Sequence, residues 1–401
     1  MKAHFVRFRG PAVVAVLLLL PACSLLQQPW RKAPPPPATP AAPTIPMAEA
    51  THRFEIDPER DDVVGLVQVT TATKEDTLSD IARRFNIGYE EIVRANPKVD
   101  PWLPGAGREI VVPTQHVLPN APREGVVINS AAMRLYYFPK RKAGERQVVI
   151  THPIGIGKVG WATPEGSTKV VRKTRNPTWR PGPGVRAEHK RNGEILPAVV
   201  PPGPDNPLGT RAMYLGWPQY LIHGTNKPYG VGLRSSHGCI RLYPEDVESI
   251  YEMMEVGEKV TVVNQPFVFG WHNDQLYLQA FGVLEDDPRD WDKAQQKLLG
   301  KALAKRIQEQ LKARNETVNW EQVSKLGHSP RGVPVSISLP DASIEQVLAG
   351  APRVQNSVPP GATWDGVSNL PVDEKSFQQM LSDSDPDAPA SSPSRGAPPR
   401  T

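Results

Sequence analysis

Proline accounts for 45 of the 401 residues, and its positions limit where regular structure can form. This share, about 11%, is roughly twice the usual one. Because proline lacks a backbone N–H and fixes φ, helix interiors and central strands exclude it. Seven prolines lie in residues 33–46, nine between Pro177 and Pro218, and nine in residues 351–401. We therefore expect an extended N-terminal segment, a central region of loops and short strands, and a disordered C-terminal tail.

The composition excludes several classes of protein. Hydrophobic residues make up 39% and charged residues 22%, which suffices for a buried core. The absence of any run of 18 apolar residues excludes a polytopic membrane protein, and two cysteines exclude a disulfide scaffold or a cysteine-rich metal protein. The net charge is +5, and without Lys2, Arg7 and Arg9 it is 5 − 3 = +2. A charge this small gives no case for a nucleic-acid partner.

The N-terminus has the pattern of an export signal. Residues 1–10 are basic, residues 11–20 are apolar, and Leu20-Pro21-Ala22-Cys23 follows. Ten apolar residues are too few to span ~30 Å of hydrocarbon, so a secretory signal is favoured over a membrane helix. The ending resembles a bacterial lipobox, which implies cleavage of residues 1–22 and lipidation of Cys23. An ordinary cleaved signal is the alternative.

That resemblance has consequences for location. Ser24 after the cysteine implies retention at the outer membrane, so we expect a periplasmic protein held by a lipid anchor. Residues 23–62 are expected to form a proline-rich linker of mainly polyproline II conformation. Such a segment is either a spacer between membrane and globular domains or an unselected disordered linker.

Residues 63–115 predict a small β-α-α-β domain. A strand is expected at 67–69 and another at 109–113, and the first helix has an apolar face at i, i+3, i+4 and i+7 (Leu78, Ile81, Ala82 and Phe85). Thr77 and Asp80 form a candidate capping box. A second short helix carries Tyr89, Ile92 and Val93 and ends at Asn96-Pro97.

This order, with the strings DTLSDIARRFNI and ANP, resembles a LysM domain. The resemblance implies binding to glycans that contain N-acetylglucosamine, such as the strands of peptidoglycan. Glu75 stands where the family usually has glycine before Asp-Thr, which puts the geometry of the first turn in doubt. The alternative is a packing module without glycan affinity.

Residues 123–264 predict a mainly β domain with one clear helix. Strands are expected at 126–129, 133–138, 148–154 and 260–263. The helix starts at Pro244 and places four apolar residues on one face (Val247, Ile250, Tyr251 and Met254).

The remaining residues carry weaker signals. A hairpin is expected over 267–281 with an Asn-Asp turn, an amphipathic helix near 289–313, a strand at 333–337, and a short helix at 344–348 capped by Ser343. Residues 265–350 would thus form a small α/β appendage, and residues 351–401 a disordered tail.

Cys239 is the residue that points to chemistry. An exported protein meets oxidising conditions, and with Cys23 lipidated Cys239 has no disulfide partner in the chain. His223 follows the apolar residues 220–222, and a thiol near an imidazole can become a nucleophilic thiolate. Gly224 and Gly238 would let backbone amides approach a substrate and hold an oxyanion. The alternatives are an inert free cysteine and a zinc site formed by His223, His237 and Cys239 with His189 or His152.

The string HGT followed by SHGCIRL, with His223 and Cys239 16 residues apart, resembles the YkuD-type L,D-transpeptidases. Further matching segments lie at 153–157, 163–166, 176–179 and 204–209. The whole resembles the periplasmic subgroup in which a LysM domain precedes the catalytic domain. It implies a mainly β, β-sandwich-like catalytic domain and an enzyme without a metal or organic cofactor.

The resemblance also implies the roles of individual residues. Cys239 would attack the bond between diaminopimelate and D-Ala in a tetrapeptide stem, and His223 would act as general base and acid. His237 and Gly238 would shape the oxyanion hole, with packing alone as the alternative for His237. A backbone or hydroxyl oxygen from the Gly224 or Thr225 region would orient His223. Arg241 would hold a substrate carboxylate, with a structural ion pair as the alternative, and Ser236 would support the turn. The acyl group would pass to a second stem peptide or to the lysine of a small outer-membrane lipoprotein. The rivals are a hydrolase and an inactive glycan-binding lipoprotein.

Overall fold

The computed structural model describes residues 45–48, 51–142, 144–191, 193, 195–291, 299, 301–303 and 305–367. The chain divides into the compact units Met1–Thr44 and Ile45–Thr401, and all described residues belong to the second. The predicted signal peptide, Cys23, most of the linker and residues 368–401 of the predicted tail lie outside the described residues. Within the described ranges, no helix has the length and apolar character needed to cross a membrane.

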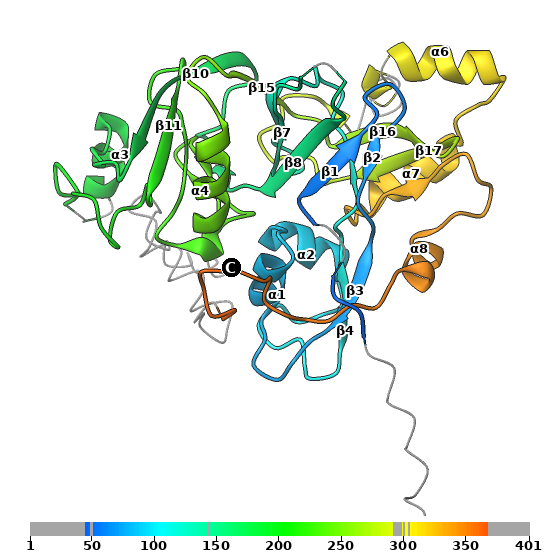
Figure 1. The fold of residues 1–401 in the computed structure, drawn as a ribbon, viewed down its shortest axis with the longest axis horizontal. Coiled ribbons are helices and arrows are strands. Elements are labelled where there is room, and N and C mark those ends of the chain that lie inside the picture. Colours follow the sequence, from blue (N-terminus) through cyan, green and yellow to red (C-terminus); the bar gives the residue numbers. More distant parts are fainter. Residues whose placement is uncertain are drawn as a thin grey trace, which may run out of the picture. The chain divides into compact units, whose positions relative to one another are not determined.

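The predicted β-α-α-β order of the LysM domain is confirmed. Its elements are β3 (Gln68–Thr71), α1 (Leu78–Arg84), α2 (Tyr89–Ala95) and β4 (Glu109–Val112), with β3 and β4 antiparallel (Figure 1). The Thr77 Oγ1 accepts the Asp80 N–H at 3.2 Å, and the Asp80 carboxylate accepts the Thr77 N–H at 2.8 Å, which is the expected capping box. The apolar face of α1 is buried in one cluster with Ile92 of α2 and with Ile110 and Val112 of β4.

A nine-stranded sheet forms the domain predicted at residues 123–264, which is mainly β as expected. Its order is β1 (Arg53–Ile56), β8 (Gln147–Pro153), β7 (Arg134–Phe138), β6 (Gly125–Asn129), β15 (Lys259–Val263), β10 (Gly166–Arg175), β11 (Arg211–Leu215), β12 (Leu221–His223) and β14 (Ile240–Arg241). The β2 (Val63–Val64) and β5 (His116–Val117) strands form a separate small pair, as do β9 (Ile156–Gly157) and β13 (Arg234–Ser236). A single 3-10 turn spans Pro228–Gly230.

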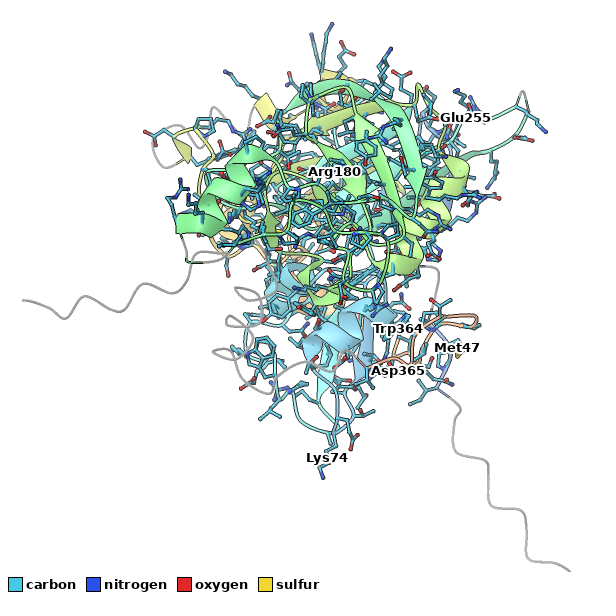
Figure 2. All side chains as sticks on the ribbon, turned by 90° about the vertical axis from the view of Figure 1, so that its left-hand side faces the viewer. Met47, Lys74, Arg180, Glu255, Trp364 and Asp365 are labelled. Carbon is cyan, nitrogen blue, oxygen red and sulfur yellow. The ribbon has the colours of Figure 1, made fainter. Side chains whose placement is uncertain are left out.

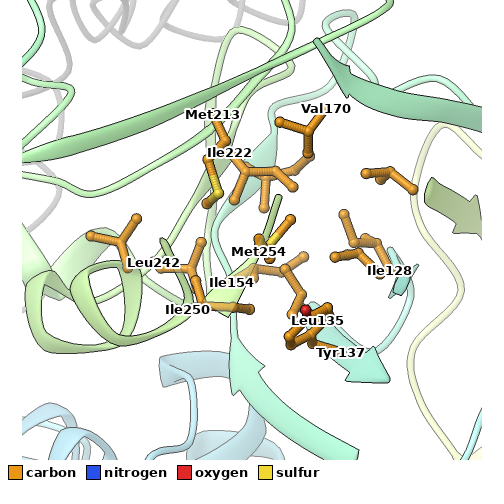
Figure 3. Close-up of a cluster of buried hydrophobic side chains, with 14 of the residues drawn as sticks. Ile128, Leu135, Tyr137, Ile154, Val170, Met213, Ile222, Leu242, Ile250 and Met254 are labelled. Atoms are coloured by element: carbon orange, nitrogen blue, oxygen red, sulfur yellow. The ribbon is translucent and has the colours of Figure 1, made fainter. Parts of the chain in front are cut away.

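Strand β10 bends the sheet into two halves. Its first four residues pair with β15, its remaining residues pair with β11, and the register shifts between Val170 and Arg172. Apolar side chains of both halves and of helix α4 (Pro244–Met253) meet in one buried cluster, part of which Figure 3 shows. The curled sheet encloses this cluster between its two halves, which is why the domain resembles a sandwich.

The predicted linker extends too far at its C-terminal end. Residues Arg53–Ile56, inside the expected 23–62 linker, form β1 and pair with β8 in the register Arg53↔Ile150. Ile56 is buried in the cluster that contains Val149. The segment joins the sheet because β8 offers a free edge, a long-range condition that local composition does not reveal.

The C-terminal appendage is an α/β unit, as expected. It contains the hairpin β16 (Phe267–His272) and β17 (Gln275–Ala280), the strand β18 (Val335–Ser336), and the helices α6 (Lys305–Arg314), α7 (Trp320–His328) and α8 (Ile344–Gly350). Asn273 and Asp274 both have positive φ, 47° and 59°, as a two-residue type I′ turn requires. Ser343 caps α8 as predicted. Residues 292–298 of the predicted 289–313 helix lie outside the described residues, and α7 was not expected.

The disordered tail was predicted to begin too early. The Val69 N–H donates to the Pro352 carbonyl at 2.9 Å, and the Val354 N–H donates to the Val69 carbonyl at 2.8 Å. Ala351 and Val354 are buried in the LysM domain, and the Arg83 guanidinium lies 4.3 Å from the centre of the Trp364 ring. Figure 2 labels Trp364 and the neighbouring Asp365. Residues 351–356 thus cover the free edge of β3, which a composition-based prediction of disorder misses.

Ion pairs join the LysM and catalytic domains. The Arg134 guanidinium makes two contacts of 2.9 Å with the Glu91 carboxylate, and Arg134 is 1% exposed. Arg83 of α1 makes a second bidentate pair with Glu245 of α4, at 2.9 and 2.8 Å. The LysM domain is therefore docked on the catalytic domain by charged contacts as well as tethered to it by the chain.

Candidate active site

Strand register brings the predicted catalytic residues onto one face of the sheet. β12 and β14 are parallel, with Ile222 opposite Ile240 and His223 opposite Arg241. Extending that register by one residue places Cys239 beside Leu221. Because side chains alternate between faces, two rows of residues share the face: Arg172, Tyr214, Leu221 and Cys239 in one, and Thr174, Ala212, His223 and Arg241 in the other.

This face is the floor of a cavity of about 600 Å³. The loop between β10 and β11, which carries the helix α3 (Pro183–Arg191), supplies the opposite wall with Trp179, Arg180 and Val185. Five of the predicted site residues line the cavity: His223, Ser236, His237, Cys239 and Arg241. Helix α3 was not expected from the sequence, because it begins at Pro183 in a proline-rich segment.

The two glycines predicted to let backbone amides approach a substrate are packed closely against neighbouring protein atoms. A Cβ on Gly238, whose φ is +96°, would lie 2.6 Å from the Tyr220 ring. A Cβ on Gly224 would lie 2.9 Å from the Val247 side chain. Neither glycine is among the residues that line the cavity. Both glycines are needed for close packing behind the site. Because glycine has no side chain, only their backbone groups could contact a substrate.

His223 ends β12 and is 3% exposed. Its Nδ1 lies 2.6 Å from the Gly224 carbonyl oxygen, which can only accept, so Nδ1 carries the proton and Nε2 the lone pair. Burial lowers the pKa of His223 to about 3, the Arg241 charge adds to this, and the hydrogen bond to Gly224 opposes it. The resting imidazole is neutral, with Nε2 available as a base.

Cys239 is a half-buried free thiol. Its Sγ–H donates to the Gln219 carbonyl at 3.4 Å. Burial raises the pKa of Cys239 to about 11, although a hydrogen bond with the Leu221 backbone and the charge of Arg241 act in the other direction. The resting thiol is therefore protonated, and the site at rest holds a neutral thiol and a neutral imidazole.

His237 lies in the cavity wall and contacts α3. Its Nε2 is 3.0 Å from Glu188 Oε2, and the other oxygen of Glu188 accepts from Lys158 Nζ at 2.8 Å. Burial lowers the pKa of His237 to about 4, against the effect of Glu188. A neutral His237 must donate its Nε2–H to Glu188, so that proton is not available to an oxyanion.

Glu188 is the site residue that the sequence analysis missed. Burial alone would raise the pKa of Glu188, but hydrogen bonds from Lys158 and His237 outweigh it and hold that pKa below its usual range. The carboxylate therefore links α3 to the segment that carries Cys239. A glutamate 49 residues away from its histidine partner has no signal in a single sequence.

Ser236 and Arg241 complete the surroundings of the thiol. The Ser236 hydroxyl donates to the Cys239 carbonyl at 2.6 Å, a contact suited to supporting the turn. Arg241 lines the cavity and donates from Nη1 to the Ser235 hydroxyl at 3.2 Å. The Thr163 hydroxyl donates to the Gly238 carbonyl at 2.9 Å and braces the same segment from outside.

The alternative zinc site does not assemble. His152 lies on the side of the sheet that faces the LysM domain, where its Nδ1 is 3.0 Å from Asp246 Oδ1. His237 already directs Nε2 at Glu188. Across the ranges that the structure describes, no three or more His, Cys, Asp or Glu side chains are grouped to hold a metal ion.

Comparison with known proteins assigns both domains. The YkuD model, the L,D-transpeptidase catalytic domain, matches residues 123–262, and the LysM model matches residues 71–113. The chain is 46% identical over 207 residues to the "Probable L,D-transpeptidase YbiS" of Escherichia coli K12, covering 51% of this chain and 66% of that protein. It is 42% identical over 224 residues to "Probable L,D-transpeptidase ErfK/SrfK" of Salmonella typhimurium, covering 55% and 71% of the two chains.

The match to YbiS thus spans just under two thirds of that relative's length. Among solved structures, an L,D-transpeptidase from Mycobacterium smegmatis is 20% identical with a TM-score of 0.27, covering 39% of this chain and 63% of that one. With its LysM domain, its YkuD catalytic domain and these relatives, the chain belongs to the L,D-transpeptidase family.

Proposed function

We propose that the protein is a peptidoglycan L,D-transpeptidase that works through an acyl-enzyme on Cys239. The observation that carries the proposal is the placement of Cys239 and His223 on one face of neighbouring strands, in a cavity of about 600 Å³. The donor is a tetrapeptide stem, in which the bond between diaminopimelate and D-Ala is broken.

The first half-reaction forms a thioester. Cys239 Sγ attacks the diaminopimelate carbonyl carbon as His223 Nε2 takes the thiol proton, and the same proton then goes to the amine of the departing D-Ala. With the pKa of the thiol about 11 and that of the imidazole about 3, the resting site holds no thiolate–imidazolium pair. The thiol proton must therefore pass to His223 in the course of the reaction.

Backbone amides at Gly238 and Cys239 are the proposed donors to the oxyanion. The side chain of His237 is committed to Glu188 and instead fixes the wall of the cavity. Rigid donors of this kind stabilise the tetrahedral intermediate most when their loop cannot move, and the Ser236 and Thr163 hydrogen bonds hold this loop.

The second half-reaction transfers the acyl group to an amine. A second stem peptide would give a crosslink, the lysine of a small outer-membrane lipoprotein would give an anchor, and water would give a shortened stem. Incubating the protein with a tetrapeptide muropeptide and each acceptor, followed by mass spectrometry of the products, separates these outcomes. If a tripeptide stem is the sole product whichever amine acceptor is added, the protein is a hydrolase. No product at all would favour an inactive glycan-binding protein.

The LysM domain is proposed to bind the glycan strands of peptidoglycan and so raise the concentration of stems near Cys239. The ion pairs Arg134–Glu91 and Arg83–Glu245 support a fixed orientation of the bound strand relative to the cavity. We further propose that the protein is exported and lipidated at Cys23, which would hold it at the outer membrane. A Cys23→Ala variant released from the membrane fraction would support the anchor, and wild-type protein found wholly in the soluble periplasmic fraction would exclude it.

A further inference from the structure

An arginine extends the row of residues that ends at Cys239. Arg172 on β10 lies opposite Tyr214, Tyr214 lies opposite Leu221, and Leu221 lies beside Cys239. The Arg172 guanidinium lies 3.4 Å from the centre of the Tyr214 ring, and its Nη1 donates to the Thr174 hydroxyl at 3.0 Å. Stacking on the ring fixes the plane of the guanidinium and leaves its edge for other partners.

The charged side chains that line the cavity are all positive. Among the described residues, its lining includes Arg172, Arg180 and Arg241 and no carboxylate. Within the same ranges, no Asp or Glu lies at ion-pair distance from Arg172, which is exposed. Arg175, three residues along the strand, is different: it lies on the other face and pairs with Glu252 at 2.5 Å. The cavity therefore offers positive charge to an anionic ligand.

The distance between Arg172 and Cys239 determines which carboxylate of the proposed donor Arg172 can bind. Its guanidinium lies over Tyr214, two strands from Cys239, which is about 10 Å from the nucleophile at ~4.8 Å per strand. The D-Ala carboxylate is only three bonds from the scissile carbonyl carbon, so it is too near the thiol to reach Arg172. The distal carboxylate of diaminopimelate is six C–C bonds away, which span about 7 Å when extended, and a hydrogen bond of about 3 Å to the guanidinium completes the span of ~10 Å.

We propose that Arg172 is a specificity-determining residue that binds the free distal carboxylate of the donor's diaminopimelate. The inference rests on the proposed function and adds the substrate class: stems whose distal carboxyl group is ionised rather than amidated. Arginine suits this role because its planar fork can give two parallel N–H···O bonds to one carboxylate. Thr174, by accepting from Nη1, orients the fork.

The test uses the full-length protein and two donors that differ only in the distal group, a free carboxylate or its amide. We expect wild type to prefer the free acid in kcat/KM by roughly 10–100-fold, as loss of a charge-assisted hydrogen bond predicts. Arg172→Gln should remove the preference by raising KM for the free acid, with the amidated donor used equally well by both proteins. Arg175→Gln, which removes the same charge on the opposite face, should keep the preference.

Three results would overturn the proposal. The first is a wild type that does not distinguish the two donors. The second is an Arg172→Gln variant that retains the wild-type preference, and the third is one that loses activity on both donors equally, as loss of a structural residue would cause. These outcomes differ from failure of the proposed function, in which wild type forms no acyl-enzyme with either donor and both proposals fall.

Discussion

Removing Glu91 should destabilise the protein by more than any surface ion pair can. Glu91 and Arg134 are 6% and 1% exposed, and two contacts of 2.9 Å join them between the LysM and catalytic domains. Glu91→Ala leaves the Arg134 charge buried with only the Thr151 hydroxyl and the Asn86 carbonyl as partners. The Glu91 carboxylate also accepts the Gly88 N–H at the start of α2, at 2.7 Å, and that contact is lost too.

Breaking a buried pair on one side costs about 3–5 kcal/mol, which corresponds to a fall in Tm of roughly 5–15 °C for a domain of this size. Calorimetry or denaturant unfolding measures the change. The control is Glu321→Ala, which breaks an i,i+4 pair with Lys325. The Glu321 side chain is 79% exposed, so this change should leave Tm nearly unaltered. A double variant, Glu91→Leu with Arg134→Met, should recover most of the loss because it removes both charges. A Glu91→Ala protein as stable as the control would refute the reasoning.

The remaining predictions concern the cavity. Alkylation of Cys239, followed on its own peptide by mass spectrometry, should keep accelerating as pH rises from 7 toward about 11, because the raised pKa keeps the thiol protonated below that value; a plateau already reached at neutral pH would mean a preformed thiolate. His223→Ala should lower kcat by roughly 10²–10⁴-fold yet leave that alkylation rate nearly unchanged, since burial rather than His223 sets the thiol pKa. Glu188→Ala should speed proteolytic cleavage within residues 176–209 and lower kcat/KM about 10-fold, because α3 loses its contacts with His237 and Lys158; unchanged cleavage would show that Glu188 does not hold the loop.

Elements with local signals were predictable from the sequence. The capping box at Thr77, the apolar face of α1 and the proline start of α4 each lie within one or two helical turns, and each is present. His223 and Cys239 also lie close together, as their motif suggested. His223 ends β12, Cys239 directly precedes β14, and these two strands pair with each other.

What the sequence could not predict depends on distant partners. β1 forms only because β8 has a free edge, and residues 351–356 become ordered only because β3 has one. Glu188 meets His237 across 49 residues, and Arg172 enters the row of Cys239 through the register of three strands. Local periodicity and composition do not predict these contacts, because they form only when folding brings distant segments of the chain together.

The most direct test of the account is the mass of the intact protein during reaction with a tetrapeptide stem. We expect one adduct equal to the donor minus D-Ala, located on the peptide that contains Cys239, with one equivalent of D-Ala released. Cys239→Ala should show neither the adduct nor any product while unfolding at the wild-type temperature. Normal turnover by a folded Cys239→Ala protein, or an adduct on another residue, would contradict the central claim.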